Sequence, residues 1–167
     1  VKLSKPAGGC FIEPNTDRCV IDTVSRIDSL NDIPSPYQTG LLDEFLADPN
    51  YCPIIETNRG CPYLCTFCDW GLMSKSKSSI FSTERVVKDL EYIVENNVSK
   101  TPYLYIGDAN FGLFPRDIEI AKLLRKYKDT KGFPDTVYLY FAKNVFEKLH
   151  FWSQNEFRKP HCLDKKL

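Results

Sequence analysis

Residues 53–71 read PIIETNRGCPYLCTFCDWG, a short β-prone run that leads directly into a loop with three cysteines. Cys61, Cys65 and Cys68 are separated by three and by two residues, so a tight loop can turn all three thiols toward one point, as an iron-sulfur cluster or a zinc ion requires. A 4Fe-4S cluster normally takes four protein thiolates. Three cysteines would therefore leave one iron open to a molecule that is not protein.

This spacing, with the aromatic Phe67 directly before the third cysteine, resembles the signature of the radical S-adenosylmethionine (SAM) superfamily. The resemblance implies that the amino and carboxylate groups of SAM chelate the open iron and that Phe67 lies near the adenine. It also implies reductive cleavage of SAM to methionine and a 5′-deoxyadenosyl radical. The cofactor carries that chemistry, while the protein supplies ligation, orientation and exclusion of water and oxygen.

Two further segments match positions where that superfamily contacts SAM. Gly107-Asp108 follows a predicted strand, where a Gly-rich acidic segment usually engages the methionine amino group, although this chain departs from the common Gly-Gly-Glu form. Glycine permits close backbone approach, and a carboxylate can accept hydrogen bonds from an ammonium group. Asn144, after the next predicted strand, is placed to reach the ribose or carboxylate of SAM. The alternatives are a simple strand-to-helix turn at residues 107–112 and a local cap at Asn144.

The wider sequence is similar to the branch of the superfamily in which the radical SAM domain follows a cobalamin-binding domain. The matching residues are Pro34-Ser35-Pro36-Tyr37, Gly40-Leu41, Arg59-Gly60-Cys61-Pro62 and Phe67-Cys68. The resemblance implies cobalamin bound through a domain that these residues do not include, and a methyl-transfer or ring-forming reaction. It also implies an electron donor such as a flavodoxin or ferredoxin. Fold analogy does not fix the substrate.

Hydrophobic patterns around the loop alternate between strands and helices. Strands are predicted at residues 54–57, 103–106 and 137–142, the last apolar on both faces as in a buried parallel strand. Apolar stripes predict a helical turn at residues 41–46, a helix capped by Ser82 or Thr83 and a second helix from Pro115 to Lys131. Right-handed crossovers between such strands give a parallel sheet with helices outside it. The predicted fold class is α/β, a partial radical SAM (β/α) barrel with about its first three strand-helix units.

Three regions are expected along the chain. Residues 1–32 form a largely irregular leader, residues 33–150 the partial radical SAM core, and residues 151–167 an unpatterned tail. The likeness covers about half of the family's core, so the sequence reads as an enzyme fragment. Such a fragment would expose apolar surface and an unpaired sheet edge, and we expect it to be poorly active by itself.

Composition excludes several classes of partner. The 22 basic and 22 acidic residues balance, and no basic block predicts binding to nucleic acid or to an anionic membrane. No apolar run approaches the roughly 18–20 residues of a membrane span, and the first residues lack the apolar core of a signal peptide, so a cytoplasmic location is expected. Seven cysteines, an odd number, favour metal binding over a disulfide scaffold.

Two alternatives stay open. The three cysteines could hold a structural zinc ion, with Cys52 or Cys162 as fourth ligand, but zinc modules usually show a second paired knuckle. The chain could also be a non-catalytic fragment. Cys10 and Cys19 have eight residues between them, too many for a tight metal-binding pair, and are expected to be unligated thiols.

Overall fold

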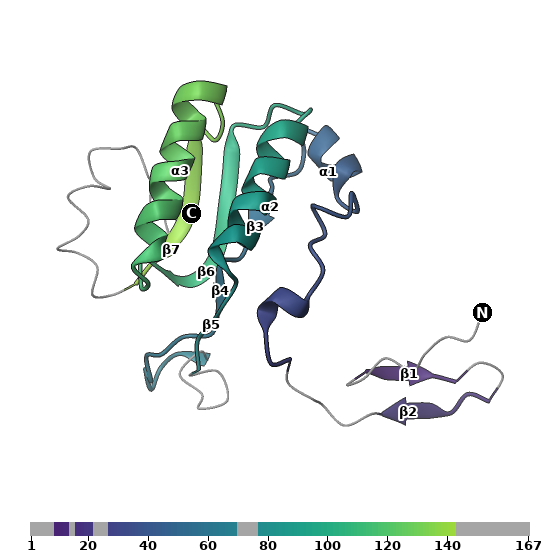
Figure 1. The fold of residues 1–167 in the computed structure, drawn as a ribbon. Coiled ribbons are helices and arrows are strands. Elements are labelled where there is room, and N and C mark those ends of the chain that lie inside the picture. Colours follow the sequence, from purple (N-terminus) through teal and green to yellow (C-terminus); the bar gives the residue numbers. More distant parts are fainter. Residues whose placement is uncertain (1–8, 14–15, 22–26, 70–76, 143–167) are drawn as a thin grey trace, which may run out of the picture.

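The computed structural model describes residues 9–13, 16–21, 27–69 and 77–142, shown in Figure 1. In chain order these residues form β1 (Cys10–Ile12), β2 (Cys19–Ile21), a 3-10 helix η1 (Leu30–Asp32), α1 (Asp43–Ala47), β3 (Ile54–Ile55), β4 (Asn58–Arg59), β5 (Ser79–Ile80), α2 (Thr83–Asn96), β6 (Tyr103–Phe111), α3 (Arg116–Lys131) and β7 (Thr136–Phe141). Within the part of the chain that the structure describes, no helix combines the length and apolarity needed to cross a membrane.

The centre of the fold is a parallel sheet with strand order β3-β6-β7. The helices α2 and α3 lie side by side over one face of this sheet (Figure 1). Leu104 and Ile106 of β6 are fully buried beneath them, whereas Tyr103 and Tyr105 alternate onto the open face. This arrangement confirms the predicted α/β class with a parallel sheet. Its closure into a radical SAM barrel stays a prediction.

Both long helices form where their apolar stripes and end signals predict them. Ser82 caps α2 by accepting a hydrogen bond from the Arg85 amide at 3.2 Å, and the buried stripe includes Leu90. The helix α3 follows Pro115 and ends at Gly132, whose φ of 73° is the left-handed conformation that glycine adopts most readily. The end signals therefore fixed each boundary to within about a residue.

The strand β6 is longer than predicted. It continues through Gly107 and Asp108 to Phe111, with an irregular register between Ile106 and Phe111, so the expected turn begins only at Gly112. Phe111 is fully buried, and its carbonyl accepts a hydrogen bond from the Ala142 amide at 2.9 Å. Both contacts favour an extended backbone as far as Phe111. The prediction of a turn at residues 107–112 is wrong for its first five residues.

Two further elements differ from expectation. In β7, Val137 and Leu139 are buried, but Tyr138 and Tyr140 lie on the open face, so this strand is apolar and buried on one face only. In the leader, β1 and β2 form an antiparallel pair that lies apart from the sheet in Figure 1. The leader thus includes one short antiparallel pair. The boundaries at residues 32 and 150 stay predictions, and the tail at 151–167 lies outside the described residues.

Candidate functional site

The cysteine loop is closed at its base by a short antiparallel ladder. β4 pairs with β5 in the register Asn58↔Ile80 and Arg59↔Ser79, and the Phe81 amide donates a hydrogen bond to the Thr57 carbonyl at 3.0 Å. The loop therefore leaves and re-enters the fold at one place. That place is the carboxyl end of β3, where sites on parallel sheets gather.

A buried carboxylate holds the first residues of this base. Asp108 of β6 is 0% exposed, and its Oδ1 accepts hydrogen bonds from the amides of Thr57 at 2.6 Å and Asn58 at 3.2 Å. Its Oδ2 accepts from the Asn58 side-chain amide at 2.8 Å and from the Thr57 hydroxyl. These four hydrogen bonds fix the corner between β3 and β4, from which the cysteine loop begins.

Burial also changes the acidity of this carboxyl. Removal from water raises the pKa of Asp108 to about 6, although the hydrogen bonds from Thr57 and Asn58 oppose that rise. The nearby charge of Asp117 raises the pKa slightly further, and burial raises the pKa of Asp117 itself. The corner is therefore sensitive to protonation in the mildly acidic range.

An arginine at the beginning of α3 ties together the two ends of the loop. The Arg116 guanidinium donates through Nη2 to the Thr57 carbonyl at 2.5 Å and through Nη1 to the Phe81 carbonyl. Burial lowers the pKa of Arg116, while the carboxylates of Asp117 and Asp108 raise it. Asp108 and Arg116 thus anchor the same short segment from two different elements.

The three predicted metal ligands lie on one short loop above these anchors. Cys61 is buried, with Sγ 3.9 Å from the Tyr63 carbonyl, while Cys65 and Cys68 are partly exposed and joined by a 3.1 Å backbone hydrogen bond. Among the residues that the structure describes, no three His, Cys, Asp or Glu side chains are grouped so that they could hold a metal ion. The donor set fits an iron-sulfur cluster, because thiolates are its ligands. Convergence of the three sulfurs stays a prediction.

The four residues predicted to contact SAM have different surroundings. Phe67 is 86% exposed on the cysteine loop. Gly107 lies on the open face of the sheet, where a Cβ would stand 3.5 Å from the Ile54 side chain. Asp108 points to the opposite face, into the corner that it holds. Asn144 lies outside the described residues.

The zinc alternative required a fourth ligand. Cys52 comes just before the amino end of β3, and its thiol lies 3.5 Å from the Pro53 carbonyl. The cysteine loop begins beyond the opposite end of that strand, so the structure does not bring Cys52 to the loop. Cys162 lies outside the described residues.

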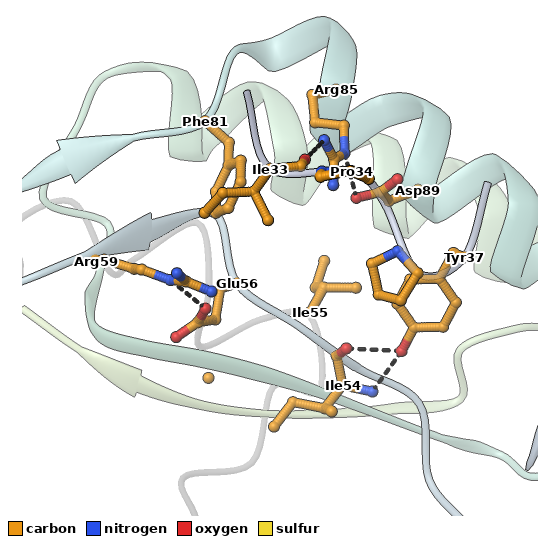
Figure 2. Close-up of a pocket in the computed structure, with 12 residues that line it drawn as sticks. Ile33, Pro34, Tyr37, Ile54, Ile55, Glu56, Arg59, Phe81, Arg85 and Asp89 are labelled. Carbon is orange, nitrogen blue, oxygen red and sulfur yellow. Dashed lines mark hydrogen bonds and ion pairs between the residues drawn. The ribbon is translucent and has the colours of Figure 1, made fainter. Parts of the chain in front are cut away.

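A pocket of about 300 Å³ lies beside the loop base, between residues 33–37, the strands β3 and β4 and the helix α2 (Figure 2). Its charged side chains are already paired: Arg59 contacts Glu56 at 2.7 Å and Arg85 contacts Asp89 at 2.9 Å. Because each cation faces an anion, these side chains give the pocket no net charge with which to select an ion. Its wall also includes Gly107.

Sequence reasoning did not find Tyr37, whose hydroxyl bonds the backbone of Ile54 at the start of β3, nor three residues of the loop base, Thr57, Asn58 and Arg116. For Thr57 the sequence shows only that it ends a predicted strand, as Gly107-Asp108 follows the next one. That Thr57 lies opposite Asp108 depends on the observed register, in which Ile55 pairs with Ile106. For Tyr37 and Arg116 the sequence carried no comparable signal, because their contacts are with backbone atoms far away in the chain.

Known proteins that resemble this chain are named as methyltransferases or methylases, and one of them is named as a radical SAM enzyme. No family model matches the chain. The chain is 40% identical over 153 residues to the 2-(S-pantetheinyl)-carbapenam-3-carboxylate methyltransferase of Streptantibioticus cattleyicolor. This match covers 86% of this chain and 22% of that protein. It is 38% identical over 146 residues to the cobalamin-dependent radical SAM methyltransferase TokK of Streptomyces tokunonensis, which covers 84% of this chain and 21% of TokK.

A third relative is the hopanoid C-3 methylase of Methylococcus capsulatus, 31% identical over 140 residues, which covers 73% of this chain and 27% of that enzyme. The chain thus spans about a fifth to a quarter of the length of the curated relatives it matches. These similarities support the radical SAM superfamily that the cysteine loop predicts.

Proposed function

We propose that this chain is part of a cobalamin-dependent radical SAM methyltransferase and that Cys61, Cys65 and Cys68 hold its 4Fe-4S cluster. Two observations taken together support the proposal. The three-cysteine loop follows the first strand of the parallel sheet, and a similarity that covers 86% of the chain necessarily includes residues 61–68. When bound, the cluster and SAM supply one-electron cleavage of the sulfonium carbon-sulfur bond.

In this proposal the chain's own residues hold and orient the cofactors. The three thiolates ligate the cluster, Phe67 lies against the adenine, and Gly107 allows the SAM amino group to approach the backbone of β6. Asn144 reaches the ribose or carboxylate of SAM. These roles rest on the resemblance of the motifs, with the open-face position of Gly107 as structural support.

For Asp108 we propose a positioning role. Contact with the SAM amino group would require the carboxylate to give up hydrogen bonds from Thr57 and Asn58, which it already receives at both oxygens. By holding these two residues, Asp108 fixes the direction in which the cysteine loop leaves the sheet. Its effect on the cluster is therefore indirect.

The partners of the whole protein are proposed from one relative and from the resemblance of the motifs. TokK is a cobalamin-dependent enzyme, and we propose that this chain works with a cobalamin bound through residues outside it. Reduction of the cluster needs a low-potential one-electron donor, for which a flavodoxin or ferredoxin is the proposed class. The methyl acceptor is not defined by these residues.

The test is anaerobic reconstitution with iron and sulfide, followed by metal and sulfide counts and an absorption spectrum. We expect about four irons per chain in the unaltered protein. Cys65→Ala should lose the cluster, whereas Cys52→Ala, which removes an exposed thiol at the other end of β3, should keep it. Stoichiometric zinc without visible absorbance would instead support the zinc module and refute the proposal.

A further inference from the structure

Two thiols outside the cysteine loop face each other on the hairpin of β1 and β2. The register pairs Cys10 with Ile21 and Ile12 with Cys19, so all four side chains lie on the same face of this two-stranded sheet. Both cysteines are exposed. They are diagonal neighbours across the hairpin, a position from which side chains can touch.

The sulfur atoms are already in contact. Cys10 Sγ lies 3.3 Å from Cys19 Sγ, within reach of a weak hydrogen bond. A disulfide has a sulfur-sulfur distance of about 2.05 Å, so closure requires an approach of about 1.2 Å. Because both side chains are exposed, the two sulfur atoms can approach without disturbing a packed core.

A metal ion is a poorer fit for this pair. Two thiolates do not complete the four ligands of a zinc site. In the described part of the chain, no further His, Cys, Asp or Glu side chain joins the two sulfurs as a group that could hold a metal. Two neighbouring cysteines are, however, all that a disulfide requires.

We propose that Cys10 and Cys19 form a reversible intrachain disulfide by exchange with a low-molecular-weight disulfide such as oxidised glutathione. One cysteine thiolate attacks glutathione disulfide, forms a mixed disulfide and releases one glutathione. The second cysteine loses its proton to water and attacks the protein sulfur of the mixed disulfide, which releases the second glutathione. Two protein thiols are oxidised, and one glutathione disulfide is reduced to two glutathione molecules.

The electrostatics of the pair fit this order of events. The neighbouring Cys19 raises the pKa of the Cys10 thiol, first through the hydrogen bond between them and then through repulsion between two negative charges. The pair therefore resists losing both protons at once, and exchange begins from a single thiolate. Closure would join β1 to β2 covalently and limit the freedom of the hairpin when it unfolds.

Peptide mapping can test the disulfide directly, because trypsin cuts between the two cysteines after Arg18. The full chain is equilibrated anaerobically with glutathione disulfide, the remaining thiols are blocked with N-ethylmaleimide, and the denatured protein is digested. We expect the peptides of residues 3–18 and 19–26 to be recovered as one linked species that glutathione separates. This linkage should exceed any pairing of Cys10 or Cys19 with another cysteine of the chain by about tenfold or more, since proximity gives the pair a high effective concentration.

Two variants complete the design. Cys52→Ser should keep the linkage, because Cys52 belongs to another part of the fold. Cys10→Ser should abolish it and leave Cys19 with a single glutathione. Recovery of unlinked peptides from the unaltered protein, whether free or each carrying glutathione, would overturn the proposal, as would cross-links distributed evenly among all cysteines. Neither result depends on whether residues 61–68 bind a cluster.

Discussion

Removal of the Asp108 carboxylate should loosen the base of the cysteine loop. In Asp108→Ala, three N–H donors lose their acceptor in a fully buried corner: the amides of Thr57 and Asn58 and the Asn58 side-chain amide. The Thr57 hydroxyl also loses its acceptor, but it can rotate toward another one. A buried donor without a partner costs about 1–3 kcal/mol, so the three together cost about 6 kcal/mol. Alanine also removes a charge whose burial is unfavourable. The rise of the Asp108 pKa from 3.8 to about 6 corresponds to about 3 kcal/mol.

The expected net loss in Asp108→Ala is therefore about 3 kcal/mol in the free energy of unfolding at neutral pH. Asp108→Asn is the matched control, because it removes the charge and keeps the shape. Its Oδ1 can still accept from both backbone amides, and its NH2 group can donate to the Thr57 hydroxyl. The Asn58 side-chain oxygen is buried without a partner, so a flip of that amide would provide a second acceptor. We expect Asp108→Asn to stay within about 1 kcal/mol of the unaltered chain.

The pH dependence gives an independent check. Because the folded-state pKa of Asp108 lies above its unfolded value, the folded protein binds this proton more tightly, and the associated stability is lost as pH rises through about 6. Between about pH 7.5 and pH 5, Asp108 should contribute a gain of about 1.4 kcal/mol on acidification. Asp108→Asn should lack this gain, while the contribution of Asp117, whose pKa is also raised, remains in both proteins.

Urea unfolding followed by circular dichroism at the two pH values measures these differences. The reasoning fails if Asp108→Ala loses less than about 1 kcal/mol, since the three donors would then have found other partners. It also fails if the unaltered chain and Asp108→Asn respond equally to acidification. In that case the carboxyl is not the group that titrates.

Two further substitutions test neighbouring contacts. Tyr37→Phe should lower the free energy of unfolding by about 1–2 kcal/mol, because the Tyr37 hydroxyl donates to the Ile54 carbonyl at 2.7 Å and accepts from its amide at 3.0 Å; an unchanged urea midpoint would contradict this. Gly107→Ala should change stability by less than about 1 kcal/mol, since its Cβ would lie 3.5–3.6 Å from its neighbours. It should still weaken SAM binding in equilibrium dialysis of the reconstituted protein, and unchanged affinity would remove Gly107 from the proposed SAM site.

Sequence patterns predicted the helices well because their ends carry explicit signals. Ser82 and Gly132 each act through one local hydrogen bond or backbone conformation, which needs no knowledge of the rest of the fold. The end of β6 has no such signal. Gly107 and Asp108 favour turns as single residues, but burial of Phe111 and its pairing with Phe141 favour extension, and these contacts form only once the sheet exists.

The same distinction explains what could be predicted about the site. The cysteine spacing and the Gly107-Asp108 pair were visible as local motifs, and the structure places both near the carboxyl end of the sheet. The face to which each side chain points depends on strand pairing. Successive side chains of β6 point to opposite faces, so Gly107 lies on the open face and Asp108 lies under the helices. The motif itself does not show which of the two residues points to which face.

The two anchors also suggest how the loop would respond to a cluster. Asp108 and Arg116 hold its base, so the start of the loop has a fixed direction. If Cys61, Cys65 and Cys68 bind the proposed cluster, the free energy of binding would also stabilise the corner that these two side chains hold. Because such coupling is reciprocal, a variant that loosens the corner should also retain iron less well. Asp108→Ala should therefore lose reconstituted iron to a chelator faster than Asp108→Asn, although neither substitution removes a thiolate.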